Sequence, residues 1–171
     1  IEKDKQMTMD FKTDGATVYL IGEMVDDISC SEYLYSYKGI KLSHAPYFDI
    51  DKEANMQKAL SDLINQGIIE SAHDVSEGGL FIAMLESAMC RNFGFELYTS
   101  GEIRLDSFLF GEGQGRVVVT VKAGKENDFI DMLNISNVPC CAVGSVRADG
   151  VIMVDEEVFG KVSDFKTVYD N

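Results

Sequence analysis

One segment restricts the possible folds of this chain more than any other. Residues 116–123, RVVVTVKA, are rich in β-branched side chains and are apolar at odd and even positions alike. Successive side chains of a strand point to opposite faces of a sheet, so a strand of this kind is apolar on both faces. Such strands are typical of the buried interior of a sheet. The sequence therefore predicts a central β-strand here.

Segments with strand and helix patterns alternate along the rest of the chain. Residues 51–66 place their apolar side chains on one helical face, and Gly67 is expected to end that helix. We expect one α+β domain, with α/β-like alternation and a mixed sheet packed with helices, over residues 13–171, and a linker or the end of a preceding domain over residues 1–12. The other expected strands are 16–23, 68–74, 92–99, 138–146 and 150–154, and the other expected helices are 29–39 (capped by Ser29 or Ser31 and stopped by Gly39), 76–91 and 125–133. Residues 156–171 have no clear pattern.

The composition excludes several classes of protein. The chain has 171 residues, of which 46% are hydrophobic, and this is enough for one well-packed core. It has no run of about 20 apolar residues, so we expect no membrane span. Acidic residues outnumber basic ones by 29 to 15, giving a net charge of −14, which argues against nucleic acid or an anionic membrane as a partner. We expect a cytoplasmic protein.

The four cysteines show no metal-binding or disulfide pattern. No CxxC pair occurs, and neither histidine lies at metal-ligand spacing from a cysteine. We expect reduced, mostly buried thiols and no metal site. Cys140 and Cys141 are neighbours in an expected strand, so their side chains should point to opposite faces, with one of them in the core.

A first candidate motif is SAHDVSEGGLFIAM, residues 71–84. Ser76 is a good helix cap, with a hydroxyl that could accept a hydrogen bond from the backbone near Gly79. Glu77 suits the positive end of a helix dipole. Gly78 and Gly79 leave the first amides of the helix uncovered by side chains, so either a phosphate or a closely packed backbone could approach them. His73 and Asp74, at the strand end, could form a hydrogen-bonded structural pair.

A second candidate motif is LFGEGQGRVVV, residues 109–119. Glu112, Gln114 and Arg116 alternate along a glycine-rich loop, which can place their side chains on one side. Glu and Gln can accept hydrogen bonds from hydroxyls or amides, and Arg can bind a carboxylate or a phosphate. The alternative is a flexible entry to the strand with a solvated Glu–Arg pair.

Together the two motifs resemble the C-terminal domain of the aminoimidazole ribonucleotide synthase superfamily, and within it the phosphoribosylformylglycinamidine synthases. TVYLIGE, SEYLY and CAVGSV followed by GVIMV add to the resemblance, which covers residues 9–166. The chain departs from the family pattern at residues 28–31, Ile-Ser-Cys-Ser, and at residues 110–113, Phe-Gly-Glu-Gly. Both departures weaken a ligand contact through hydroxyl groups at these places.

The resemblance implies a domain of an ATP-dependent ligase of purine biosynthesis, which converts formylglycinamide ribonucleotide, glutamine-derived ammonia and ATP to the amidine. It implies an N-terminal domain of the same protein that holds ATP and magnesium, and a glutaminase domain or subunit. The present chain alone should then be inactive and should bind neither cofactor tightly.

The resemblance also implies a set of site residues, and it favours a cleft at the Ser76–Gly79 turn over simple packing. It assigns no catalytic residue and no metal ligand to this chain. Substrate or phosphate contacts are expected from Ser76, Gly78, Gly79, Glu112 and Gln114. Residues expected to contact these groups rather than the ligand itself are His73, Asp74 and Arg116.

Two other classes of function stay open. The chain could belong to another superfamily member, such as a thiamine-monophosphate kinase, a selenophosphate synthase or a hydrogenase-maturation protein. It could also be a non-catalytic interaction module that keeps the fold without the site.

Overall fold

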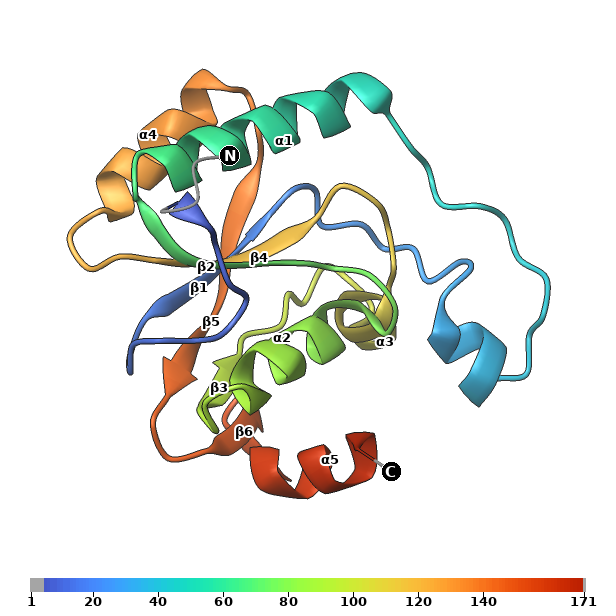
Figure 1. Cartoon of the computed structure of the whole chain (residues 1–171). Helices are drawn as coiled ribbons and strands as arrows, with labels where there is room; N and C mark the ends of the chain where they lie inside the picture. The colour runs from blue at the N-terminus through green and yellow to red at the C-terminus, as the bar shows by residue number, and fades with distance from the viewer. Residues whose placement is uncertain (1–4, 171) are drawn as a thin grey trace.

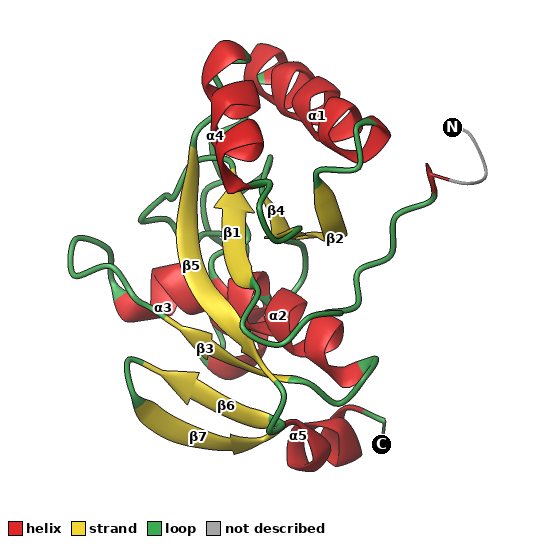
Figure 2. Ribbon diagram, turned by 90° about the vertical axis from the view of Figure 1, so that its left-hand side faces the viewer, coloured by secondary structure: helices red, strands yellow, loops and turns green. Residues whose placement is uncertain are grey.

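A seven-stranded mixed sheet organises the chain in the computed structural model, which describes residues 5–170 (Figures 1 and 2). The strands lie in the order β2-β4-β1-β5-β3-β6-β7. Hydrogen-bonded neighbours are antiparallel, except that β3 and β6 run parallel. The strands are β1 (Thr17–Ile21), β2 (Ile69–Asp74), β3 (Gly94–Leu97), β4 (Val117–Val121), β5 (Cys140–Arg147), β6 (Val151–Val154) and β7 (Glu157–Lys161).

The predicted central strand is confirmed as β4. It lies between β2 and β1, and all five of its residues are buried. Val117, Val119 and Val121 face one core, while Val118 faces another. The apolar character of both strand faces therefore follows from two separate layers of helices.

Helices cover both faces of the sheet. The first core contains buried residues of α1 (Ile50–Asn65) and α4 (Glu126–Ile135), which Figure 1 shows together at the top. The second contains residues of α2 (Gly79–Met89), α3 (Leu105–Phe110) and α5 (Val162–Tyr169). The observed α+β fold is the one expected from the sequence.

Several elements differ from their predicted form. The helix expected over residues 76–91 begins only at Gly79, because its cap Gly78 has a left-handed φ of +82° and a helix cannot continue through that residue back to Ser76. The helix expected over residues 29–39 is a single π-helical turn, η2 (Tyr33–Tyr37), in which the Ser31 hydroxyl accepts a hydrogen bond from the Leu34 amide. α3, β7 and α5 have no counterpart in the sequence prediction.

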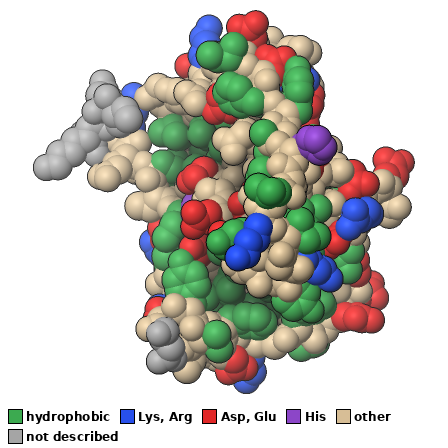
Figure 3. Space-filling model, turned by 90° about the vertical axis from the view of Figure 1, so that its right-hand side faces the viewer, with side chains coloured by type: hydrophobic (Ala, Val, Ile, Leu, Met, Phe, Trp, Pro, Cys, Tyr) green, Lys and Arg blue, Asp and Glu red, His purple; other side chains and the backbone are tan. Residues whose placement is uncertain are grey.

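A long connection between β1 and α1 extends away from the body of the domain. We call residues 32–49 the arm; it begins with η2 and lies at the right of Figure 1. Apolar side chains of the arm are exposed, and they belong to the face turned to the viewer in Figure 3. The large exposed ones are Tyr35, Tyr37, Ile40, Leu42, Tyr47 and Phe48.

Residues before the predicted domain start also pack on this fold. Phe11 is fully buried, and its amide donates a hydrogen bond to the Ser87 carbonyl. The Thr8 carbonyl accepts a hydrogen bond from Ala72 of β2. The boundary between residues 12 and 13 stays a prediction, and residues 1–4 lie outside the described part of the chain.

The expectation that the cysteines are mostly buried is wrong. Cys30 and Cys90 are exposed, and Cys140 and Cys141 are half-buried; none forms a disulfide. Cys140 packs against the α1/α4 core and Cys141 against the α2 core, which confirms that they point to opposite faces. Neither is fully buried, because both lie at the first residues of β5.

Candidate functional site

The two glycine-rich motifs meet at the first turn of α2. The Glu112 carboxylate oxygen Oε1 accepts hydrogen bonds from the amides of Gly78 and Glu32, each at 2.8 Å. A negative charge is favourable at the N-terminus of a helix, because the free amides there carry partial positive charge. The amide of Gly78, which the sequence leaves open to an anion, is thus bonded to a carboxylate of the same chain.

Gly79 packs against the backbone of the second motif. A β-carbon on Gly79 would lie 2.8 Å from the carbonyl oxygens of both Leu109 and Gly111, which is closer than such contacts occur. Gly79 therefore allows α2 to approach the end of α3. This is the close backbone packing that the sequence left open beside anion binding.

Arg116 shapes the glycine-rich loop from inside. Its side chain is buried, with Nε donating to the Gly113 carbonyl at 2.9 Å and Nη2 donating to the Gly111 carbonyl at 2.5 Å. Burial lowers the pKa of the guanidinium to about 10, while the nearby Glu112 carboxylate acts in the opposite direction. The alternative of a solvated Glu–Arg pair is wrong, because the guanidinium bonds to carbonyls of its own loop.

The same loop leads Gln114 to the wall of a cavity of about 700 Å³. Gln114 is exposed, unlike the buried Arg116 two residues later. The loop can lie close to β1 because Gly22 has no side chain: a β-carbon there would lie 2.1 Å from the Gly115 carbonyl oxygen. The other walls come from residues 22–27, from the end of the arm and the first turns of α1 (residues 46–56), and from the end of α4 with residues 137–139.

The cavity combines acidic and aromatic side chains. Its carboxylates belong to Glu23, Asp26, Asp27, Asp49 and Glu53, and its aromatic rings to Tyr47 and Phe48. The one lysine in the wall, Lys52, is paired with Glu23 at 2.6 Å between Nζ and Oε1.

Some of the carboxylates of the cavity serve the local structure. Asp49 caps α1 by accepting hydrogen bonds from the amides of Asp51 and Lys52. The bond from the Lys52 amide is the main cause that lowers the pKa of Asp49. Among residues 5–170, no group of three or more His, Cys, Asp or Glu side chains is arranged to hold a metal ion.

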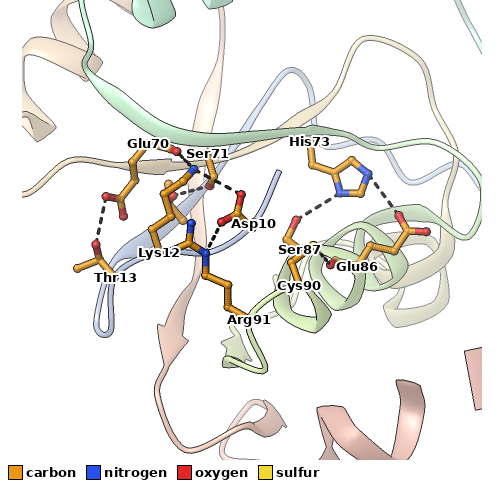
Figure 4. Close-up of polar contacts among 11 residues, drawn as sticks. Asp10, Lys12, Thr13, Glu70, Ser71, His73, Glu86, Ser87, Cys90 and Arg91 are labelled. Carbon is orange, nitrogen blue, oxygen red and sulfur yellow. Dashed lines mark hydrogen bonds and ion pairs between the residues drawn. The ribbon is translucent and has the colours of Figure 1, made fainter. Parts of the chain in front are cut away.

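His73, Asp74 and Ser76 lie apart from the cavity lining. The His73 ring packs on α2, with Nδ1 3.1 Å from the Ala83 carbonyl oxygen. Figure 4 shows its contacts with the Ser87 hydroxyl and with Glu86, of which one carboxylate oxygen lies 3.3 Å from Nε2. The predicted His73–Asp74 pair is wrong, because neighbouring strand residues point to opposite faces. Asp74 and Ser76 are exposed, and the Ser76 carbonyl, rather than its hydroxyl, accepts the bond from the Gly79 amide.

The structure thus separates the predicted site residues into three places. The junction of α2, α3 and the loop holds Gly78, Gly79, Glu112 and Arg116, and the cavity wall holds Gln114. The third group, His73, Asp74 and Ser76, lies outside the cavity lining. Sequence reasoning missed the other walls of the cavity. Two local signals point to them: the acidic stretch GEMVDD, residues 22–27, and the aromatic stretch PYFD, residues 46–49.

The fold and the cavity define an α+β domain in which a glycine-rich loop forms one wall of a cavity lined by acidic and aromatic side chains. Residues 13–155 match the family described as "AIR synthase related protein, C-terminal domain", and the chain belongs to this family. No helix among residues 5–170 has the length and apolar character needed to cross a membrane.

The chain is similar to curated proteins named phosphoribosylformylglycinamidine synthase subunit PurL. It is 34% identical over 149 residues to the protein of Caldanaerobacter subterraneus, with 87% of this chain and 20% of that protein covered. The identity to the Thermus thermophilus protein is also 34%, over 146 residues, with 84% of this chain and 20% of that protein covered. The chain therefore spans about a fifth of the length of these relatives.

Solved structures share the fold. Thermotoga maritima PurL complexed with FGAR superposes with a TM-score of 0.80 at 18% identity, covering 94% of this chain and 29% of the other. Thiamine-monophosphate kinase from Stenotrophomonas maltophilia gives a TM-score of 0.59 at 16% identity, covering 92% of this chain and 55% of the other.

Proposed function

We propose that the chain is the C-terminal domain of a cytoplasmic, ATP-dependent phosphoribosylformylglycinamidine synthase. The complete enzyme would convert formylglycinamide ribonucleotide and ammonia to the amidine, with the ammonia supplied by a glutaminase domain or subunit. The observation that carries the proposal is the match of 87% of the chain to a PurL subunit. Solved relatives include PurL complexed with FGAR, PurL complexed with ATP, and PurLQS, and they support the proposed substrate, nucleotide and assembly.

Gln114 is the residue that we propose for substrate contact. Its exposed amide lies at the cavity wall, where it can both donate and accept hydrogen bonds. The carboxylates around it favour the uncharged amide and hydroxyl groups of the substrate over its phosphate, because like charges repel. We propose that cations from another part of the enzyme bind the phosphate.

At the N-terminus of α2, Glu112 controls whether the Gly78 amide is available to a ligand. The Gly78 amide can meet a substrate phosphate only if the Glu112 carboxylate moves away, since that carboxylate occupies the same donor. Ser76, two residues before Gly78, is exposed and can contact a substrate or a neighbouring domain. We propose a supporting role, without direct contact to the substrate, for His73, Asp74 and Arg116.

ATP and magnesium belong, in this proposal, to an N-terminal ATP-site domain of the same protein. Magnesium prefers carboxylates together with phosphate oxygens, and the described residues 5–170 gather no metal-binding group of three or more side chains. We therefore expect that the chain alone does not hydrolyse ATP. Metal-dependent ATP turnover by the rigorously purified 171-residue chain would contradict this arrangement.

The test is amidine formation by the longer protein that contains this chain. The wild-type protein should convert formylglycinamide ribonucleotide with ammonia and ATP. Gln114→Ala should raise the KM for that substrate about three- to tenfold, as expected for the loss of one or two hydrogen bonds. Asn127→Ala, on the exposed side of α4, is the matched amide control and should leave KM unchanged. No turnover by the wild-type protein would refute the proposed function, and an unchanged KM in Gln114→Ala would refute the role of Gln114.

A further inference from the structure

Two ends fix the arm, and one of them depends on Glu112. At the first end, the amide of Glu32 donates to Glu112 Oε1, and the Tyr33 ring stacks on Phe110 with centroids 5.1 Å apart and planes 3° apart. At the second end, Asp49 caps α1. Between these ends the arm is bonded to the residues just before it, which we call its base: the Cys30 amide donates to the Ser43 hydroxyl at 2.7 Å.

The arm also forms part of the cavity. Pro46, Tyr47 and Phe48 are in the cavity wall, as is Gln114 of the glycine-rich loop. Glu112, which holds the start of the arm, is only two residues from Gln114 in that loop. A shift of the arm relative to the loop would therefore change the shape of the cavity.

We propose that Glu112 is a positioning residue that locks the arm to the first turn of α2 and thereby sets the distance between the Tyr47–Phe48 wall and Gln114. One carboxylate oxygen accepts both amides at 2.8 Å, so α2, the arm and the loop share a single acceptor. Hydrogen bonds to a charged acceptor are about twice as strong as neutral ones. Removal of the carboxylate leaves two amides without this partner and frees the arm at its base.

The effect on catalysis rests on the proposed function, whereas the effect on the arm does not. In this proposal Glu112 acts through the two backbone amides whose hydrogen bonds it accepts and not by direct contact with the substrate. Its loss should weaken substrate binding through the displaced wall and leave the chemical step unchanged. This separates a positioning role from direct contact with the reacting groups.

Hydrogen exchange on the 171-residue chain tests the lock without any substrate. The probe is the segment 32–40, in which Tyr35, Lys38 and Ile40 donate backbone hydrogen bonds within the arm and its base. Glu112→Ala should speed exchange in this segment about tenfold, as expected for the loss of a charge-assisted bond. Glu112→Gln keeps an acceptor oxygen and should stay within about threefold of the wild type. Glu77→Ala removes an exposed carboxylate of the same turn and should have no effect.

Unchanged exchange over residues 32–40 in Glu112→Ala would overturn the proposal. If that variant does not fold, Glu112→Asp replaces it. Its carboxylate is one methylene shorter and cannot reach both amides from the same backbone, so faster exchange is again expected. Exchange at the wild-type rate in Glu112→Asp would overturn the proposal as well.

Kinetics of the longer protein complete the test. In Glu112→Ala the KM for formylglycinamide ribonucleotide should rise about fivefold at unchanged kcat, and Glu112→Gln should restore it. A fall in kcat that Glu112→Gln does not restore would show direct participation and overturn the positioning role. If the wild-type protein forms no amidine while exchange in the arm still responds, only the proposed function fails.

Discussion

The α-carbon of Gly79 lies against the carbonyl oxygen of Leu109, so closely that a β-carbon at residue 79 would come within 2.8 Å of that oxygen. α2 and α3 therefore meet backbone to backbone at the point where the two glycine-rich motifs join. The same turn holds the Glu112 carboxylate on the Gly78 amide. A substitution at Gly79 should thus disturb the helix contact and the carboxylate together.

Gly79→Ala should lower the free energy of unfolding of the 171-residue chain by about 1–3 kcal/mol, the usual cost of overpacking. The positive φ of +70° adds to this cost, because alanine rarely adopts it. Urea denaturation of the isolated chain gives the value. Gly124→Ala is the matched control, since Gly124 has a similar φ of +79° and no atom lies within 4 Å of a β-carbon there, so it should show only the cost of the positive φ, about 1 kcal/mol. Equal stability of the two variants would show that the contact at Gly79 is not tight.

Arg116→Met should destabilise the chain by about 2–4 kcal/mol, because the carbonyls of Gly111 and Gly113 lose their donors inside the protein. The methionine keeps much of the buried aliphatic volume, so the lost hydrogen bonds dominate. Denaturation with urea again measures the change. Arg104→Met is the control: Arg104 is an exposed arginine bonded to Asp106, and its loss should cost less than about 1 kcal/mol. If Arg116→Met and Arg104→Met lower the free energy of unfolding by the same small amount, Arg116 does not hold the loop in place.

Local patterns predicted the elements whose burial is regular. β4 is apolar at every position and is buried at every position, and α1 has Met56 and Leu63 on the face that its spacing indicates. β7 was missed because its residues are almost all exposed, which leaves no alternation to detect. α3 has six residues, too few to show a helical period.

The candidate site was only partly predictable, because its geometry depends on contacts between distant segments. The sequence singled out Gly78 and Glu112, 34 residues apart, as ligand contacts, whereas the structure joins them to each other. The cavity exists where Gly22 of one segment meets Gly115 of another. No local pattern encodes that meeting, and so the acidic and aromatic walls were not recognised.

The Asp49 cap should make stability depend on acid pH. Hydrogen bonds from the helix amides, first that of Lys52, lower the pKa of Asp49 in the folded chain. The unfolded chain then binds the proton more readily, so the stabilisation is present above the unfolded pKa of about 4 and is lost as the pH falls through the folded pKa.

Asp49→Asn tests this dependence, because asparagine keeps a capping oxygen and does not titrate. Between about pH 5 and pH 2 the Tm of the wild type should fall more steeply than that of Asp49→Asn. Asp51→Asn removes an exposed carboxylate two residues away and serves as the control for net charge. Identical profiles of Tm against pH for Asp49→Asn and Asp51→Asn would show that the Asp49 cap does not make stability depend on pH.

The four thiols should fall into two classes of reactivity. The thiolate is the reactive form, and burial raises the pKa of Cys140 and of Cys141, so both are less ionised at neutral pH than free cysteine. Cys90 and Cys30 are exposed. We expect iodoacetamide at pH 7.5 to alkylate these two at least about tenfold faster than the pair in β5.

Peptide mass spectrometry of the native chain, sampled over time, measures all four rates in one experiment. Both exposed thiols donate to a backbone carbonyl, Cys30 to that of His44 at 3.2 Å and Cys90 to that of Glu86 at 3.4 Å, so the two should react at similar rates. The Cys140→Ser and Cys141→Ser variants identify the two slow sites, and denatured protein supplies the reference in which all four react alike. An intramolecular disulfide in the native chain, or Cys140 and Cys141 reacting as fast as Cys90, would contradict the half-buried placement of both thiols on opposite faces of β5.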